Sequence, residues 1–429
     1  MSDGPSRPGD QGAAAERRHQ SPVTRTGGLV SQPKARLVSR SFLVLWAGSL
    51  AFFVSFQILL TALPVYAVQR LQAREAEIGL IIGLFAASAM LTRLPVGWVL
   101  ERGHRVPVLA AGAAVFALSA AGYALIDATG PALAAAWAAG PLASLLALRL
   151  FHGTGMASFT TAGQTLVVDL APVGRRGEAL GVYGIAGNVA SALGPAAGMA
   201  LALALGFRAL FATSIAVALV AVALSTAVAD PLPRPTQVRT ARLFNRAVLR
   251  PGLLMLALTF TYGAVASFVP LLAIQRGVVN PGVFFSVYAG AMVAAQAVAG
   301  RVSDRFGRSS TALPGLALAA TGLLAISALG GWWLLAAGAI YGMGAGATQP
   351  ALFAAAGDLA APGQRGSAMA TMGLFLELGI SSGSIVAGFL AGPLGLATTF
   401  VIVAVVPLVG MVIGAASGRR GRAHPAALA

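Results

Sequence analysis

The sequence predicts an all-α membrane protein with twelve transmembrane helices in two pseudo-symmetric bundles of six. Three observations lead to this prediction: a chain with few charges, twelve apolar segments of membrane-spanning length, and a weak repeat between the two halves. Only 10% of the 429 residues are charged and 57% are hydrophobic, with a mean hydropathy of +0.81. A soluble domain carries about 25% charged residues, so this composition indicates an outer surface that faces lipid.

The composition also excludes several kinds of chemistry. The chain has no cysteine, which rules out disulfides, thiolate nucleophiles and cysteine-bound metals. Its four histidines have no metal-ligand spacing, and no glycine-rich phosphate-binding loop is present. We therefore expect no metal site, no cofactor and no enzymatic activity.

The first 40 residues are polar and rich in Gly, Pro, Ser and Arg, with no apolar run before Ser41. A secretory signal peptide needs a short apolar core near its start, so this segment does not resemble one. We expect residues 1–40 to form a disordered cytoplasmic tail.

The apolar segments fall into two groups of six, each segment long enough to cross a hydrocarbon layer about 30 Å thick. The first bundle, 41–229, is expected to contain spans at about 41–67, 76–100, 106–126, 141–169, 177–204 and 208–229. A basic, proline-containing linker follows at 230–248. The second bundle, 249–417, is expected to contain spans at about 249–275, 281–303, 309–329, 332–357, 366–391 and 394–417, before a cytoplasmic C-terminal tail at 418–429. The alanine-rich segment 128–140 could hold a short additional helix.

The positive charges lie mostly on one side of these spans. Of the 29 Lys and Arg residues, 23 lie in the tails, the linker and the loops on the same side, and only four lie on the other side. Positive charge collects on the cytoplasmic face. Both termini and the linker are therefore predicted to be cytoplasmic, in the inner (cytoplasmic) cell membrane. The net charge of +16 then favours contact with anionic lipid headgroups and does not indicate nucleic acid.

The two halves of the chain resemble each other. Gly97, Glu101 and Arg102 match Gly300, Asp304 and Arg305 at an offset of 203, and Asp169, Arg176, Gly177 and Gly194 match Asp358, Arg365, Gly366 and Gly383 at an offset of 189. Repeated bundles of this kind are typical of transporters that move two halves around a central site.

A loop motif follows the second span of each half. The second copy has glycines at Gly300 and Gly307, an acid at Asp304 and arginines at Arg305 and Arg308; the first, one residue shorter, has Gly97, Glu101, Arg102 and Arg105. This pattern resembles the loop signature of the major facilitator superfamily. The carboxylate at a cytoplasmic helix end could accept hydrogen bonds from arginine and from a neighbouring helix N-terminus, as a latch between the bundles. Alternatively, these charges only anchor the loop at the membrane interface.

The fourth span contains Arg149, His152, Gly153 and Gly155 in a pattern similar to the superfamily's helix-4 motif, with His in place of Gln. The resemblance implies that Arg149 takes part in proton coupling, and an arginine within a span is a functional hypothesis by default. The alternative is an arginine that extends to the outer interface.

The fifth span contains Gly194, Pro195 and Gly198, similar to the motif associated with exporters, although Ala190 and Met199 replace two of its glycines. Gly-Pro would kink the helix and permit close packing; an ordinary proline kink is the alternative. The resemblance points to the drug/proton antiporter branch. That branch often carries an acid in helix 1, where this chain has Gln57.

Among the 13 acidic residues, only Glu377 lies deep within a span. It follows the start of the eleventh span by eleven residues, which is about 16 Å at the rise of an α-helix. A carboxyl group at that depth tends to exchange protonation for substrate or for a conformational change. We predict that Glu377 binds a proton or a cationic substrate; the alternative is a protonated carboxyl group bonded to a neighbouring helix.

Further polar and aromatic residues within the spans are candidates for a substrate cavity. They are Gln57, His152, Asn188, Tyr262, Tyr288, Gln296, Tyr341 and Gln349. Aromatic residues make up only 7% of the chain, so no aromatic cage is expected.

These features together predict a secondary active transporter. The expected activity is proton-coupled efflux of a small, amphipathic organic compound by alternating access. No ATP-binding loop is present, so the energy for transport must come from a gradient. Its partners would be a small-molecule substrate, protons and the lipid bilayer, and the resemblance suggests a monomer. Uptake or uniport of a small metabolite is the alternative. A non-transporting membrane sensor fits less well, since a sensor should carry a soluble domain.

Overall fold

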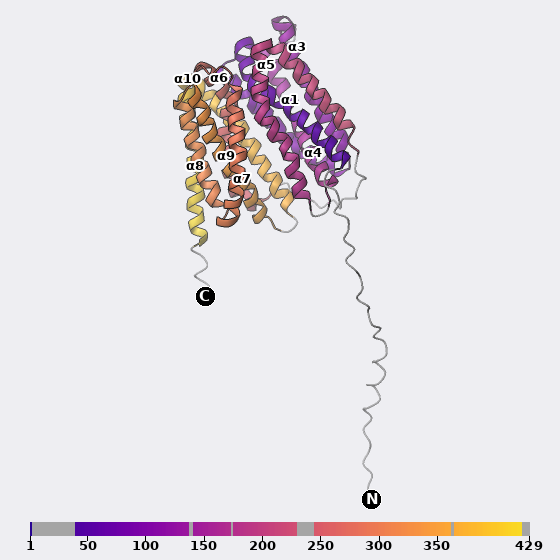
Figure 1. Ribbon diagram of the computed structural model, residues 1–429, viewed down its shortest axis with the longest axis vertical. Helices are drawn as coiled ribbons and strands as arrows, with labels where there is room; N and C mark the ends of the chain where they lie inside the picture. Colours follow the sequence, from indigo (N-terminus) through magenta and orange to yellow (C-terminus); the bar gives the residue numbers. More distant parts are fainter. Residues whose placement is uncertain (2–38, 137–139, 173–174, 230–243, 362–363, 423–429) are drawn as a thin grey trace. The chain divides into compact units, whose positions relative to one another are not determined.

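A computed structural model describes the chain outside residues 2–38, 137–139, 173–174, 230–243, 362–363 and 423–429 (Figure 1). All regular structure in this described part is helical. The predicted N-terminal tail and most of the predicted linker lie outside the described residues.

The first half contains five helices that provide six spans. They are α1 (Arg40–Leu71), α2 (Glu75–Glu101), α3 (Arg105–Ala136), α4 (Gly140–Leu170) and α5 (Arg176–Thr226). Helix α5 has 51 residues and breaks at Gly206, whose φ of 84° lies in the left-handed region that favours glycine. The break divides α5 into two spans. Helix α3 breaks at Gly130, where φ is 53° and ψ is −146°, and a short helical segment follows to Ala136, so the segment 128–140 contains the short additional helix that the sequence allowed.

The second half repeats this plan. After a short 3-10 turn, η1 (Arg246–Val248), come α6 (Leu249–Gln275), α7 (Gly282–Phe306), α8 (Ser309–Ala328), α9 (Trp332–Leu359) and α10 (Arg365–Arg422). Helix α10 has 58 residues and breaks at Gly395, where φ is 75°. It also continues as a helix into the predicted C-terminal tail. The prediction of two six-helix bundles is confirmed.

The helices have the length and composition of membrane spans. Eight of the helices in the described residues are long and apolar enough to cross a membrane, α5 and α10 among them. Helices α4 and α9 are not among the eight, although their 31 and 28 residues each exceed 30 Å at the α-helical rise. They occupy equivalent places in the two halves and carry Arg149 and His152 in α4, and Tyr341 and Gln349 in α9. Their lower hydropathy thus reflects polar residues that the rest of the bundle surrounds.

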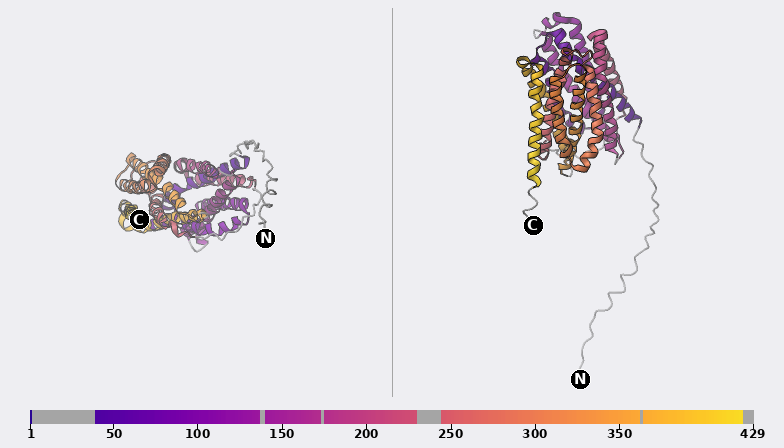
Figure 2. Two further views of the ribbon diagram at one scale, coloured as in Figure 1. Left: turned by 90° about the horizontal axis from the view of Figure 1, so that it is seen from below. Right: turned by 60° about the vertical axis from the view of Figure 1, so that its left-hand side comes forward.

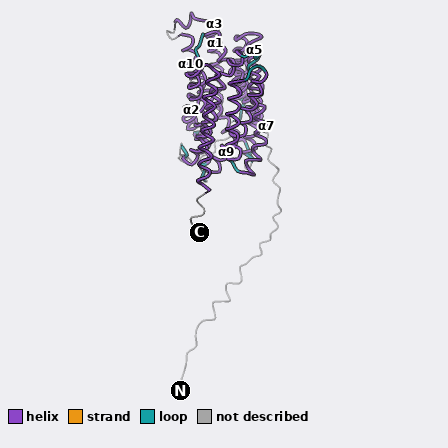
Figure 3. The backbone as a smooth tube through the Cα atoms, turned by 90° about the vertical axis from the view of Figure 1, so that its left-hand side faces the viewer, coloured by secondary structure: helices purple, strands orange, loops and turns teal. Residues whose placement is uncertain are grey.

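The helices of the first half (indigo to magenta) lie beside those of the second half (orange to yellow) in Figure 2, and Figure 3 shows them all as helix; the contacts within each half are similar. Helix α1 packs on α5, and α4 on α2 and α3; correspondingly, α6 packs on α10, and α9 on α7 and α8. The halves meet chiefly where α2 contacts α10 and where α5 contacts α7. We call this contact region the seam. The linker face is the end where α1 begins, α2 ends and α10 begins; the far face is the opposite end, with Gly206 and Gly395.

Candidate transport site

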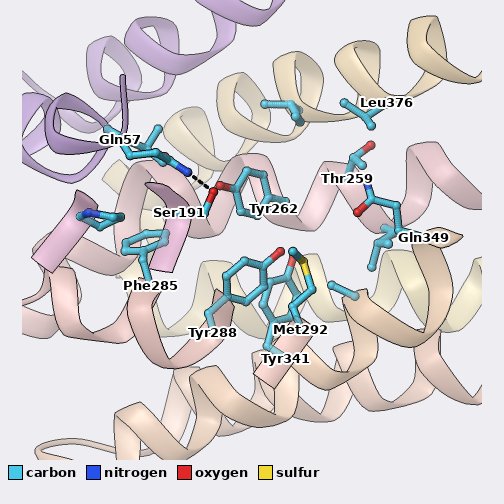
Figure 4. A pocket seen from close by; sticks show the side chains of 15 residues that line it. Gln57, Ser191, Thr259, Tyr262, Phe285, Tyr288, Met292, Tyr341, Gln349 and Leu376 are labelled. Atoms are coloured by element: carbon cyan, nitrogen blue, oxygen red, sulfur yellow. Dashed lines mark hydrogen bonds between the residues drawn. The ribbon is translucent and has the colours of Figure 1, made fainter. Parts of the chain in front are cut away.

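A cavity of about 160 Å³ of water-accessible space lies between the two halves (Figure 4). Helices α1 and α5 contribute from the first half, and α6, α7, α9 and α10 from the second. Its lining residues are Gln57, Leu60, Ser191, Pro195, Leu258, Thr259, Tyr262, Phe285, Tyr288, Met292, Tyr341, Ala345, Gln349, Leu376 and Ile380. Five of the eight predicted cavity residues are in this set: Gln57, Tyr262, Tyr288, Tyr341 and Gln349.

Three tyrosines form a stack along one wall of the cavity. The ring centroids of Tyr262 and Tyr288 are 5.8 Å apart, and those of Tyr288 and Tyr341 are 5.6 Å apart, with interplanar angles of 29° and 25°. Tyr341 shares a 2.8 Å hydrogen bond with Thr261. Half of the chain's six tyrosines thus gather at one site. The low overall aromatic content did not indicate this.

Polar atoms remain available around the cavity. The side-chain amide of Gln57 donates from Nε2 to Ser191 Oγ, while its Oε1 is buried without a hydrogen-bond partner. Within the described residues, the hydroxyl groups of Tyr262 and Tyr288 also make no hydrogen bond, and both belong to the lining. A ligand can therefore satisfy groups that the protein leaves unpaired.

The other three candidate residues do not line this cavity. Asn188 and Gln296 are half-buried on α5 and α7. His152 is fully buried inside the first half, where its Nδ1 lies 3.0 Å from the hydroxyl of Tyr123 and 3.3 Å from Arg149 Nη1.

Arg149 is also enclosed by the first half, with 1% of its surface exposed. Its Nε donates to the carbonyl oxygen of Ile81 over 2.7 Å, and its guanidinium lies 4.3 Å from the centre of the Phe85 ring. The side chain therefore points to α2 and does not extend to the membrane interface. It ties the carbonyl of Ile81 to α4.

Glu377 of α10 contacts an arginine of the other half. Its Oε1 lies 2.6 Å from Nη2 of Arg93 on α2, and 10% of the Glu377 side chain is exposed, against 28% for Arg93. The interaction is a charge-assisted hydrogen bond across the seam. Arg93 lies within the predicted span at about 76–100, and its place in the sequence did not indicate its partner.

The far part of the seam is closely packed. A Cβ on Gly79 of α2 would lie 2.6 Å from the carbonyl oxygen of Ser384 on α10. Ser384 and Ser381 donate hydrogen bonds to the carbonyl oxygens of Gly79 and Gly83 over 2.8 and 2.9 Å. Similarly, Asn280, just before α7, donates to the carbonyl oxygen of Ala196 on α5 over 3.0 Å.

The linker part of the same four helices is loosely packed. A Cβ would meet no atom within 4 Å at Gly97 of α2, Gly177, Gly181 and Gly184 of α5, Gly300 of α7, or Gly366 and Gly373 of α10. Most glycines of the seam helices toward the far face are thus in close contact, whereas those toward the linker face, and Gly290 of α7, border open space.

The two loop motifs form equivalent ion pairs. In the first half, Arg105 Nε lies 2.5 Å from Asp169 Oδ2 at the end of α4. In the second half, Arg308 donates to Asp358 Oδ2 at the end of α9 over 2.8 Å, and also to Asp304. These two carboxylates raise the pKa of Arg308 above its usual value.

The remaining motif residues have different surroundings. Arg102 stacks on the ring of Trp98 at 3.0 Å, Arg305 lies 5.3 Å from the Phe306 ring, and Gly307 has a positive φ of 91°. Glu101 is exposed and makes no ion pair with another described residue.

The helix-5 motif packs α5 against α1. Gly198 lies directly on the backbone of Ile58, and a Cβ on Gly194 would lie 2.5 Å from the Cβ of Gln57. Pro195 between them lines the cavity. The motif thus holds α5 close to the helix that presents Gln57.

Two halves of six spans around a central cavity, with repeated motif ion pairs, define a membrane transporter. The model of the Major Facilitator Superfamily matches residues 45–284 and 281–427, and the chain belongs to this family.

Characterised and uncharacterised relatives agree with this assignment. The staphylopine export protein of Staphylococcus aureus is 24% identical over 273 residues, which span 59% of this chain and 64% of that protein. An uncharacterised transporter of the family from Burkholderia mallei is 26% identical over 65% of this chain and 69% of its own length.

Solved structures show the same fold. A bacterial homologue of the human lysosomal transporter Spinster, in an inward-facing and occupied conformation, has a TM-score of 0.72 at 16% identity, covering 88% of this chain and 96% of that one. A POT family transporter in complex with 5-aminolevulinic acid has a TM-score of 0.71 at 14% identity, covering 87% and 95%. These likenesses show the fold and agree with the family assignment.

Proposed function

We propose that this transporter exports a small organic compound in exchange for protons, by alternating access to the cavity between its halves. The observation that carries the proposal is the position of the cavity at a seam that is packed toward the far face and loose toward the linker face. This arrangement corresponds to a state in which the site is reached from the linker face. A relative movement of the halves would reverse the access.

The linker face would be the cytoplasmic one. The excess of Lys and Arg in the loops and tails of that face supports this orientation, in the cytoplasmic membrane with both termini inside. The membership of the superfamily supports a monomer as the working unit.

Glu377 would couple protons to this movement. When ionised, it pairs with Arg93 and adds to the contacts between α2 and α10. A proton on Glu377 neutralises the carboxylate and weakens its bond to Arg93, so the protonation of Glu377 is coupled to the packing of α2 against α10.

Arg149 would transmit the state of α2 to the first half. It binds the carbonyl of Ile81, between Gly79 and Gly83, whose own carbonyls accept from α10. Movement of α2 at the seam therefore changes the surroundings of the buried guanidinium group of Arg149. The two loop motifs would act at the cytoplasmic side in the opposite state, when that side closes.

Export is supported by the similarity to a staphylopine export protein and by the Gly194-Pro195 motif, which packs beside the cavity. Uptake or uniport is the second candidate, because Gln57 places an uncharged group where an antiporter often has an acid.

Growth of a deletion strain and an overexpressing strain on a panel of compounds would identify substrates. The transport of each identified substrate is then measured in inverted and right-side-out vesicles with an imposed proton gradient. If the protein is an exporter, a proton gradient should drive the accumulation of the substrate in inverted vesicles. The Glu377→Gln variant should lose this accumulation. Full gradient-driven transport by Glu377→Gln would refute the coupling role. Accumulation only in right-side-out vesicles would establish uptake.

A further inference from the structure

The cavity contains no ionisable group that could balance a charged ligand. None of its fifteen lining residues is Asp, Glu, Lys, Arg or His. Arg93 and Glu377 contact each other across the seam and are not part of the lining. An unpaired ion transferred from water to such a site loses far more hydration free energy than a neutral molecule does.

The tyrosine stack favours a planar ring. Rings that are within 30° of parallel face one another, as Tyr262, Tyr288 and Tyr341 do. A box for an organic cation needs ring faces that converge on one point. A stack instead presents an end face to another ring and hydroxyl edges to hydrogen-bonding groups. Phe285 and Met292 add apolar surface to the same wall.

In the opposite half, the lining residue Gln57 has an acceptor without a partner. Gln57 is 8% exposed, its Nε2 is used by Ser191, and its Oε1 is buried and unpartnered. A buried acceptor without a partner is costly, and an N–H or O–H of a bound molecule would supply the missing donor. Figure 4 shows Gln57 and Ser191 beside the three tyrosines, so one molecule can contact both groups.

The volume agrees with a small aromatic molecule. The cavity offers about 160 Å³, and an apolar cavity of about 150 Å³ is enough to hold benzene. The enclosed part therefore suits one ring system, and substituents can extend toward the open linker side.

We infer that the cavity binds an uncharged, planar aromatic compound through the stack of Tyr262, Tyr288 and Tyr341 and a donor to Gln57 Oε1. This inference rests on the proposed function, because the bound compound is a transport substrate only if the protein works as proposed. Its binding test, however, requires neither a proton gradient nor transport.

The test uses the purified full-length protein in lipid nanodiscs, with empty nanodiscs as the baseline for partitioning into lipid. Tryptophol, tryptamine and indole-3-acetate share one ring and a similar side chain but are neutral, cationic and anionic. Tryptophol should bind at least about tenfold more tightly than either ion. Indole should bind about five- to tenfold more tightly than 1-methylindole, which lacks the N–H donor.

Variants locate the binding. Tyr288→Leu should weaken tryptophol, Tyr288→Phe should retain most of the affinity, and Gln57→Glu should shift the preference toward tryptamine. Tyr183→Phe is the matched control, because Tyr183 is buried away from the cavity and bonds to Ser49. Gln57→Glu keeps the test valid if Tyr288→Leu fails to fold, because its expected shift of preference also locates the binding.

Three results would overturn the inference: an ion that binds the native protein as tightly as tryptophol, tryptophol binding that neither Tyr288→Leu nor Gln57→Glu alters, or no measurable binding of any compound. Expected binding without gradient-driven flux would instead refute the proposed function. Proton-driven transport of charged compounds alone would refute only this inference.

Discussion

Arg93 and Glu377 join the two halves at the level where close packing of α2 against α10 gives way to open space. On the far side of the pair, Ser381 bonds to Gly83; on the linker side, Gly97 and Gly373 have no neighbour for a Cβ. The 2.6 Å contact thus lies at the edge of the closed part of the seam. A proton that binds Glu377 therefore weakens a contact at the level where the two halves separate.

Removal of one partner of this pair should cost more than removal of both. A buried charge without its partner is destabilising by about 3–5 kcal/mol in fully enclosed sites, and less here because Arg93 is partly exposed. We expect Glu377→Gln and Arg93→Gln each to lower the melting temperature, and the double variant to be more stable than the sum of the two effects. A double-mutant cycle on the purified protein measures this coupling. Additive effects would contradict the pairing.

The packed and open parts of the seam should differ in their reactivity toward thiol reagents. The native chain has no cysteine, so single cysteines can be labelled without background. Cysteine in place of Gly373 should react readily, because this position faces open space, whereas Ser384→Cys should be protected. Addition of Glu377→Gln should increase labelling at position 384. Ser214→Cys, equally buried but within the first half, is the control and should remain protected.

The sequence predicted the fold well because the membrane imposes simple constraints. Apolar length, the positive-charge bias and the repeat each follow from the chain alone. The break at Gly206 falls between two predicted spans, and the break at Gly395 lies at the second residue of the last predicted span, although the structure continues as helix on both sides of each break. The repeat also aligned Asp169 with Asp358, and each pairs with the arginine at the equivalent loop position, Arg105 and Arg308 respectively.

The site was less predictable because it depends on the approach of helices from different halves. Periodicity places Tyr288 on one helix face, but only the packing of α6, α7 and α9 brings it between Tyr262 and Tyr341. The partner of Glu377 is separated from it by 284 positions. An opposite charge within another span, Arg93, was the one signal that could have indicated it.

The helix-5 glycines should tolerate substitution differently along the same helix. A methyl group on Gly198 meets the backbone of Ile58, whereas one on Gly181 meets nothing. Crowding of this kind costs about 1–3 kcal/mol, while Ala is favoured over Gly in a helix by about 0.5–1 kcal/mol. Gly198→Ala should therefore lower the melting temperature, and Gly181→Ala should leave it unchanged or raise it. Equal shifts would contradict the close approach of α5 to α1.

The two motif arginines should contribute unequally to stability. The side chain of Arg105 is 9% exposed in its pair with Asp169, whereas Arg308 is 30% exposed and Asp358 is 60% exposed. Exposed pairs contribute only about 0–1 kcal/mol and are screened by salt. Arg105→Gln should therefore destabilise the protein more than Arg308→Gln does. Thermal unfolding at low and high salt measures both, and the effect of Arg308→Gln should diminish more as the salt concentration rises.

Arg149 should not be replaceable by lysine. Its guanidinium donates to the Ile81 carbonyl, approaches His152 Nδ1 and lies over Phe85, and one ammonium group cannot make these contacts together. We expect Arg149→Lys to reduce gradient-driven transport by at least about tenfold, the loss that corresponds to one strong hydrogen bond to a charged group. His152→Gln is the matched variant, because an amide oxygen can still accept from Arg149 and from Tyr123, so its transport should stay close to that of the native protein. Normal transport by Arg149→Lys would show that any cation suffices and would refute a role that depends on the geometry of the guanidinium.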